Sequence, residues 1–190
     1  MKKLKQELLK DKNTLEFLKQ IAGPLATDIV KMFEKQSLTP EQVSDKLNEK
    51  ITVVRSTLNS LHYRGIACYK KERRKDNNLY EFYWEIKYKK IIEILLIQEM
   101  KKFKKLEYTI EDKQIHDFFY CPKKCIELPF EEAAGYNFKC PNCNSNLEMV
   151  DTKKKITTLK RKKTNIQKNI NRLEEILNKI NDDTKGYICE

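Results

Sequence analysis

Residues 39–84 decide the fold of the first half of this chain and read TPEQVSDKLNEKITVVRSTLNSLHYRGIACYKKERRKDNNLYEFYW. The segment opens with a helix start, because Thr39 can cap free backbone N–H groups, Pro40 suits the first helical position and Gln42 completes a capping box. After a short turn a second helix begins, and Gly65 ends it. Its inward-facing residues recur at helical spacing and are Ile51, Val54, Leu58 and Leu61.

A hairpin follows these helices. Residues 66–70 and 79–84 are strand-like runs, and the polar residues 71–78 between them form a basic turn. On the N-terminal side, apolar spacing predicts one helix over residues 1–20 and another that begins near Leu25. Helices followed by a hairpin with a basic tip are the order of a winged helix, here with an added N-terminal helix.

Four of the six cysteines fall into two closely spaced pairs, CPKKC at residues 121–125 and CPNC at residues 140–143. Two such pairs at this separation are typical of a tetrahedral four-thiolate zinc site, although C-x2-C is commoner than the C-x3-C of the first pair. Strands predicted at residues 118–120 and 136–139 would make residues 118–150 a zinc ribbon. Four thiolates leave no open position for chemistry, so one structural Zn2+ is expected. The candidate ligands are Cys121, Cys125, Cys140 and Cys143.

The last segment is an amphipathic helix. Beyond Asp151, apolar residues alternate at intervals of three and four, with Lys163 as the single charged interruption. Two interpretations stay open, a helix that packs back on its own protein and a coiled-coil contact. The residues of the seam are Ile156, Leu159, Lys163, Ile166, Ile170, Leu173, Leu177 and Ile180.

The whole chain is therefore expected to be α+β and mostly helical. We predict an extended winged-helix domain at residues 1–87 and a linker helix with a connector at residues 88–117, the helix running from Tyr88 to about Lys105. The zinc ribbon and a C-terminal heptad helix with its tail follow at residues 118–150 and 151–190.

Composition narrows the classes of function. The formal net charge is +11, which predicts attraction to a polyanion or to an acidic protein surface. With four glycines and no phosphate-cradling loop, nucleophile elbow or acid–base pair, no enzyme activity is expected. No run suits a membrane span or a signal peptide, which predicts a cytoplasmic protein with no membrane partner.

The two remaining cysteines, Cys68 and Cys189, belong to neither predicted pair. In a chain without an export signal, paired cysteines favour metal over a disulfide bond, as in a reducing cytoplasm. Cys68 is then expected to be a small core residue in its strand, and Cys189 a free thiol in the tail.

The basic turn is the second candidate site. Its cations can pair with phosphates, and the rings of Tyr80, Tyr83 and Trp84 beside it can stack on unpaired bases. The alternative is a solvated loop over an ordinary aromatic hairpin core, because alternation places about half of the rings inward. The cations are Lys70, Lys71, Arg73, Arg74 and Lys75.

The helix before the hairpin offers little for reading bases. A base-reading helix presents Arg, Asn, Gln or Lys to the major groove. We therefore expect contacts with the DNA backbone or with protein rather than sequence-specific readout. The outward positions are Thr52, Arg55, Ser56, Asn59 and His62.

The order of these parts resembles archaeal transcription factor E, the counterpart of the alpha subunit of eukaryotic general transcription factor IIE. Residues 58–76 look like the third helix, strand and wing of that family, and residues 138–143 with Leu147-Glu148 look like its second zinc knuckle. The resemblance covers residues 5–150 and departs at residues 121–125, one residue longer than the usual first knuckle.

The resemblance implies a non-enzymatic initiation factor that binds RNA polymerase and stimulates promoter opening. The family's winged helix contacts the polymerase clamp near upstream non-template DNA, without sequence specificity, and its ribbon faces the stalk and clamp. Here Arg73, Arg74 and Lys75 with Tyr83 and Trp84 would form the surface that faces DNA or the clamp. TATA-binding protein and a beta subunit are further candidate partners, and the location would be nucleoid-associated.

Two other classes of function remain open at this point. The first is a winged-helix DNA-binding repressor in which the C-terminal heptads and the zinc module form a dimerisation arm. The second is an adaptor that binds only proteins and has no salt-dependent affinity for a single-stranded bubble.

Overall fold

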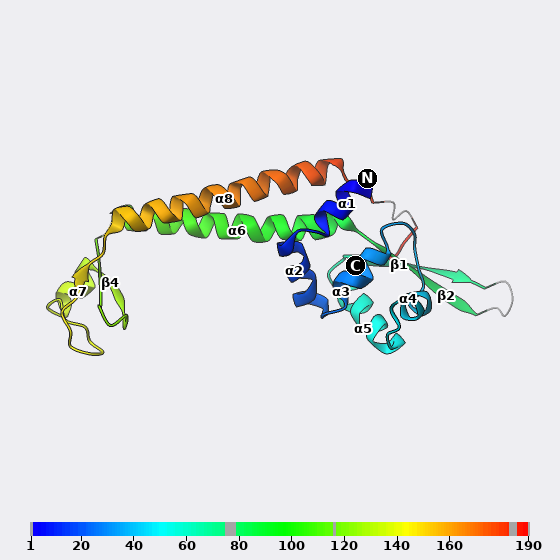
Figure 1. The fold of residues 1–190 in the computed structure, drawn as a ribbon, viewed down its shortest axis with the longest axis horizontal. Coiled ribbons are helices and arrows are strands. Elements are labelled where there is room, and N and C mark those ends of the chain that lie inside the picture. The colour runs from blue at the N-terminus through cyan, green and yellow to red at the C-terminus, as the bar shows by residue number, and fades with distance from the viewer. Residues whose placement is uncertain (1, 75–78, 116, 183–185, 190) are drawn as a thin grey trace. The chain divides into compact units, whose positions relative to one another are not determined.

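The computed structural model describes the chain apart from residues 1, 75–78, 116, 183–185 and 190. It is mostly helical with two small sheets (Figure 1), as the sequence predicted. The chain divides into two compact units, of which the first comprises residues 1–97 and 172–190 and the second residues 98–171. Each unit contains one of the sheets.

The first unit begins with three helices, α1 (Lys2–Leu8), α2 (Lys12–Ala22) and α3 (Ala26–Met32). The single helix predicted over residues 1–20 is wrong, because the chain breaks at Asp11. The backbone of Asp11 is extended, and its carboxylate accepts a hydrogen bond of 3.1 Å from the backbone N–H of Thr14. Asp11 thus caps a new helix, which is the usual role of Asp at this position.

Helices α4 (Pro40–Leu47) and α5 (Ile51–His62) follow. The predicted capping box is confirmed: the N–H of Gln42 donates to Thr39 Oγ1 at 3.3 Å, and the N–H of Thr39 donates to Gln42 Oε1 at 3.1 Å. Gly65, just beyond α5, has a φ of +67°, which a glycine adopts without strain.

The hairpin consists of β1 (Ala67–Arg73) and β2 (Tyr80–Ile86), both longer than predicted. The strands are antiparallel, with Tyr69 opposite Trp84. Leu38 forms a bridge with Trp84 on the other edge of β2, so the residue just before the α4 cap holds the base of the hairpin. Figure 1 shows α4 and α5 beside this hairpin.

The C-terminal tail forms a bridge with β1. The N–H of Tyr69 donates to Ile188 O at 3.0 Å and the N–H of Ile188 donates to Tyr69 O at 2.7 Å. Next to this pair, Cys189 is joined to Cys68 by a disulfide bond. The expectation of a free thiol at Cys189 is therefore wrong, because the fold brings this tail residue next to Cys68 of β1, 121 positions earlier in the chain.

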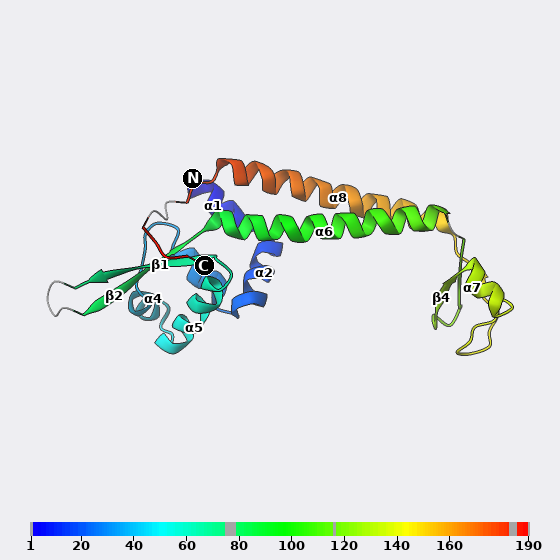
Figure 2. The same ribbon diagram turned by 180° about the vertical axis from the view of Figure 1, so that it is seen from behind.

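Two long helices, α6 (Tyr88–Ile115) and α8 (Thr152–Lys179), each contribute residues to both units. Helix α6 continues ten residues beyond its predicted end at Lys105. Within the second unit the two helices lie side by side (Figure 2). The contacts of Lys163 with α6 explain how a charged side chain fits the apolar seam of α8. Its ammonium lies 2.6 Å from Glu107 Oε1 and 4.7 Å from the ring centroid of Phe103.

The apolar seam of α8 is used within the chain. Ile170, Leu173 and Ile180 are buried as expected, and Ile176, which the heptad pattern left out, is buried too. Of the two interpretations, the helix that packs on its own protein is therefore the one that the structure contains. None of the described helices has the length and apolar character needed to cross a bilayer.

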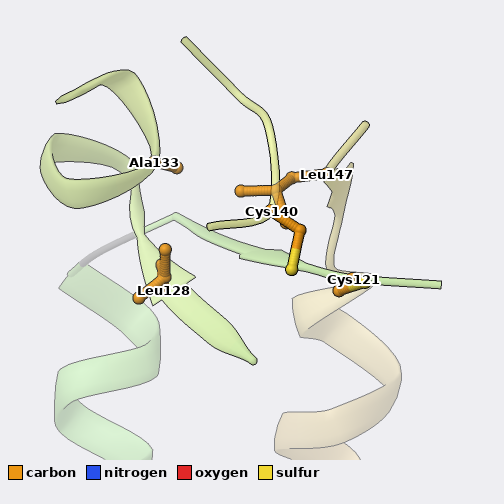
Figure 3. Packing of buried hydrophobic residues seen from close by; sticks show 5 residues of the cluster. All are labelled: Cys121, Leu128, Ala133, Cys140 and Leu147. Atoms are coloured by element: carbon orange, nitrogen blue, oxygen red, sulfur yellow. The ribbon is translucent and has the colours of Figure 1, made fainter. Parts of the chain in front are cut away.

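The remaining elements form a small module in the second unit: β3 (Phe118–Tyr120), β4 (Glu127–Pro129), α7 (Phe130–Gly135) and β5 (Glu148–Met149). The strands pair antiparallel in the order β4-β3-β5. We call residues 118–150 the cysteine module. Its buried core is small and includes two of the cysteines (Figure 3). The core residues are Cys121, Leu128, Ala133, Cys140 and Leu147.

The strand predicted at residues 136–139 is wrong, and α7 was not predicted. Asn137 and Phe138 have φ values of 49° and 54°, so the backbone turns sharply after α7 instead of extending. Phe138 packs against Phe119 and Phe130, with ring centroids 5.0 and 5.8 Å apart. A strand-like composition therefore reflects an aromatic contact here, not a strand.

Candidate functional site

The four predicted ligand cysteines come together in the cysteine module. Their sulfur atoms all lie within 4.8 Å of one another, and Cys121 Sγ is 3.4 Å from Cys143 Sγ. Zinc–sulfur bonds of about 2.3 Å in a tetrahedral site place the sulfurs roughly 4 Å apart, so the donor set fits a zinc ion. The arrangement could thus hold one metal ion, with all four positions taken by protein.

The longer first knuckle is accommodated by its backbone. Lys124 has a φ of 60°, and its N–H donates to Cys121 O at 2.8 Å, so the additional residue is absorbed in a left-handed turn. The second knuckle turns in the same way at Asn144, whose φ is 57° and whose N–H donates to Cys140 O at 2.8 Å. The C-x3-C spacing therefore does not prevent convergence of the sulfurs.

The thiols differ in their surroundings. Cys121 and Cys140 are buried, whereas Cys125 is exposed. The hydroxyl and backbone N–H of Ser145 lower the pKa of Cys143 to about 6. Hydrogen bonds with Cys143 and Cys121 raise the pKa of Cys125 to about 12. Of these two thiols, Cys143 is the more readily ionised, and thiolates are the form that binds metal.

Glu127 links the cysteine module to α6 and α8 through two ion pairs. It accepts hydrogen bonds from Lys113 Nζ of α6 at 2.7 Å and from Lys155 Nζ of α8 at 2.6 Å. Burial alone would raise the pKa of Glu127, but these two lysines outweigh it and hold the pKa below its ordinary value. One carboxylate in β4 thus joins three elements.

The wing cations are partly neutralised by neighbouring acids. Lys70 Nζ lies 2.6 Å from Glu72 Oε1, and this hydrogen bond raises the pKa of Lys70. Arg74 Nε lies 3.4 Å from Glu81 Oε1. The positive charge of the hairpin is therefore smaller than the sequence suggested.

The remaining wing cations differ in their surroundings. Lys71 Nζ lies 3.7 Å from the ring centroid of Tyr80. Arg73 is exposed at the end of β1, and Lys75 lies outside the described residues.

The aromatic residues of the hairpin divide between its two faces. Trp84 is only 6% exposed, and its ring packs against Tyr69 and His62 at centroid distances of 5.3 and 5.8 Å. Its indole N–H is buried, and no partner occurs among the residues that the structure describes. Tyr83 points to the other face, where its hydroxyl donates to Glu81 at 3.0 Å.

The exposed rings of the hairpin are Tyr80 and Phe82, which are 54% and 41% exposed. Phe82 is not among the predicted site residues. The signal was present in the alternation of β2, because Tyr80, Phe82 and Trp84 share one face and Trp84 alone is close enough to α5 to be buried.

These rings line a groove between the hairpin and the two helices before it. The groove has a volume of about 640 Å³, and we call it the wing groove. Arg55 and Asn59, two of the outward residues of α5, line it from the helix side. The groove is lined by Pro40, Glu41, Arg55, Asn59, Tyr69, Arg74, Leu79, Tyr80, Glu81, Phe82 and Trp84.

The family model and the similar proteins of known name agree on one family. The family model described as "TFIIE alpha subunit" matches residues 14–114, which is more than half of the chain. Transcription factor E of Sulfolobus acidocaldarius is 32% identical over 160 residues, covering 83% of this chain and 94% of that protein. Transcription factor E of Metallosphaera sedula is 34% identical over 138 residues, 73% of this chain and 78% of that protein.

A third relative agrees, whereas a solved structure adds nothing. Transcription factor E of Thermococcus kodakarensis is 32% identical over 155 residues, 80% of this chain and 84% of that protein. The crystal structure of Streptococcus pneumoniae FabT in complex with DNA matches 66% of this chain and 80% of that chain at 19% identity. Its TM-score of 0.28 is too low to support an argument. The family model and the relatives together show that the chain belongs to the TFIIE alpha family of transcription factors, with proteins named transcription factor E among its relatives.

Proposed function

We propose that this chain is a basal transcription initiation factor that binds RNA polymerase and promoter DNA near the bubble and stimulates promoter opening without catalysing a reaction. Membership of the TFIIE alpha family supports the role in initiation. The observation that carries the DNA contact is the wing groove, in which the exposed rings of Tyr80 and Phe82 lie beside cations. Rings and cations together suit unpaired bases and their phosphates.

The polar residues of α5 favour contact with the backbone of a DNA strand over the reading of bases. Arg55 is the strongest candidate in α5 for a base contact, but its Nη2 lies 2.7 Å from Oε1 of Glu41, which engages the guanidinium. The extended winged helix at residues 1–87 would then contact DNA and the polymerase clamp through Lys70, Lys71, Arg73, Arg74, Lys75 and Tyr83. Trp84 would support the groove from its buried side.

The other parts have structural and docking roles in this proposal. Cys121, Cys125, Cys140 and Cys143 would hold one structural Zn2+, which links the two knuckles. The ribbon at residues 118–150 would face the polymerase stalk and clamp, with the linker at residues 88–117 before it and the helix and tail at residues 151–190 after it. TATA-binding protein and a beta subunit are the further partners. The repressor alternative is weakened because Ile170, Leu173 and Ile180 of the seam are buried within one chain.

The experiment is a pull-down of RNA polymerase followed by permanganate footprinting of a weak promoter with and without the protein. We expect the protein to increase the number of reactive thymines, and Y80A/F82A to lose that gain while still binding polymerase within about 3-fold. Stacking of a base on a ring contributes about 1–3 kcal/mol, enough to change the open fraction strongly. The matched control is Y63A/Y108A, which removes two rings that are 76% and 72% exposed outside the wing groove.

Two results would contradict the proposal. If the wild-type protein produces no gain in melted bases, it is not an initiation factor of this kind. If Y80A/F82A melts the promoter as well as the wild type does, the contact does not lie in the wing groove.

A further inference from the structure

The first part of α8 is uniformly basic. Residues 152–171 contain eight lysine or arginine residues and no aspartate or glutamate. At a rise of 1.5 Å per residue this stretch is about 30 Å long. A helix segment of this length with charge of one sign repels itself unless an anion lies beside it.

Three of the eight cations are paired within the chain. Lys155 binds Glu127, Lys163 binds Glu107, and Lys154 lies 3.2 Å from Asp151. For the other five, no carboxylate lies within 4 Å among the residues that the structure describes, and all five are exposed. They are Lys153, Lys160, Arg161, Lys162 and Lys168.

Four of these five share one side of the helix. Residues 153, 160, 161 and 168 are related by steps of seven and eight, which return to the same side after two turns. They span 15 steps along the helix, or about 22 Å. We call Lys153, Lys160, Arg161 and Lys168 the basic face. Arg161 and Lys168 lie opposite the seam that contains Lys163 and the buried Ile170, and Lys153 and Lys160 lie on its flank.

We propose that the basic face of α8 is a second DNA-binding surface, which holds the phosphate backbone of duplex DNA without reading its sequence. This inference goes beyond the proposed function, which places DNA only at the wing. Duplex DNA carries one phosphate charge per 1.7 Å of its axis, so a row of cations about 22 Å long faces a matching row of anions. Cations without a base-reading geometry position a duplex but do not select its sequence.

The composition of the helix favours a duplex over single-stranded DNA and over an anionic membrane. Residues 152–171 contain no aromatic residue, and single-stranded DNA needs rings on which its bases stack. A helix that binds an anionic membrane needs an exposed apolar side, whereas the apolar residues of this stretch are buried or half-buried. The duplex requires only exposed cations in a row, and the basic face provides them.

The test uses the full zinc-loaded chain and a fluorescent 20-base-pair duplex of random sequence, with anisotropy measured from 0.05 to 0.3 M salt. We expect K153Q/K160Q/R161Q/K168Q to lose about 10-fold or more in duplex affinity at 0.1 M salt. The slope of log K against log salt should decrease by about 3 to 4, since each phosphate contact contributes about 0.9. The double variant K160Q/R161Q should show about half of that change in slope, and K153R/K160R/K168R should bind as the wild type does.

The matched control removes the same charge from four exposed lysines of the first unit that have no ion pair among the described residues. It should lose less than about 3-fold, because net charge alone acts weakly at this salt concentration. Equal losses in the two quadruple variants, or no change in slope for the basic-face variant, would overturn the proposal. So would a loss that is as large for a single strand of the same length or for an anionic vesicle. The control variant is K3Q/K10Q/K19Q/K35Q.

Discussion

Glu41 and Arg55 join the first turn of α4 to the outward side of α5. Arg55 Nη2 donates to Glu41 Oε1 at 2.7 Å, and both residues line the wing groove. Burial alone would raise the pKa of Glu41, but hydrogen bonds from its own backbone N–H, from Arg55 and from Thr39 outweigh it and hold the pKa below 4.5. This pair therefore fixes the guanidinium of Arg55 in the groove at neutral pH.

We expect R55Q to raise the pKa of Glu41 toward 4.5, measured by NMR titration of the side-chain carboxyl between pH 3 and 6. Because the folded pKa is the lower one, the pair stabilises the fold above pH 4.5, and this contribution is lost as the pH falls through the folded pKa. Both side chains are more than half exposed, so the contribution is at most about 1 kcal/mol. The control R64Q should leave the titration of Glu41 unchanged; an equal shift in both variants would show a general charge effect.

The structural role of a single residue was predictable where it depends only on neighbours in the sequence. Thr39 and Gln42 form the capping box because the residues that satisfy the helix end are three positions apart in the sequence. Trp84 shows the limit of such reasoning: its type suggested a ring for stacking, but its position in β2 beside Tyr69 buries it. Which members of an alternating row are covered depends on where the strand meets the helices, and that is a tertiary property.

The same distinction between local and tertiary causes applies to helices, strands and turns. The seam of α8 was predictable because its period of three and four is a property of the helix itself, and Lys163 fits the seam because Glu107 of α6 neutralises it. The knuckles converge because the pairs of cysteines carry their own turns. Helix α7 and the turn at residues 136–139 were missed because six residues with two glutamates and two alanines give no apolar period to detect.

We expect the cysteine module to depend on a bound metal ion for its fold. Without the two buried cysteines the buried cluster retains Leu128, Ala133 and Leu147, against which the partly buried Phe119, Ile126 and Phe138 pack. Burying a large aliphatic side chain contributes about 1.5–3 kcal/mol, whereas binding of structural zinc contributes about 10–16 kcal/mol. We expect chelation, or C140S, to abolish the amide dispersion of residues 118–150 in a 15N NMR spectrum while the resonances of residues 12–73 stay in place.

The companion measurement is the zinc content by mass spectrometry under native conditions. We expect one ion per wild-type chain and none in C140S. N142S, which changes an exposed residue inside the same knuckle, should retain the ion and the spectrum. Unchanged resonances of the cysteine module after the metal has been removed would contradict the zinc assignment.

On the scale of the whole molecule, the first unit is closed by residues from the end of the chain. Arg172 lies 3.2 Å from Asp11, and the carboxylate of Asp182 accepts a hydrogen bond of 2.7 Å from the N–H of Lys89 at the start of α6. The tail then pairs with β1 and ends in the disulfide bond to Cys68. No local pattern in the sequence marks these contacts, and this is why Cys189 was expected to be a free thiol.

The disulfide bond should make the stability of the first unit depend on redox state. A loop of about 100 residues or more that is closed by a disulfide bond stabilises a fold by up to about 4–5 kcal/mol, through the lost entropy of the unfolded chain. We therefore expect C189S to melt well below the oxidised wild type, by several degrees, and at the same temperature as the reduced wild type. Thermal unfolding followed by the fluorescence of Trp84, the single tryptophan of the chain, reports on this unit.

Counting thiols gives an independent check of the same bond. Under denaturing conditions with a chelator, the oxidised chain should expose four reactive thiols, those of the cysteine module, and the reduced chain six. Reduction should also free the tail, because two backbone hydrogen bonds at Tyr69 and Ile188 are too few to hold a strand alone. Six thiols in protein purified without reductant, together with equal melting temperatures for wild type and C189S, would contradict the disulfide bond and leave Cys68 as a reduced core residue.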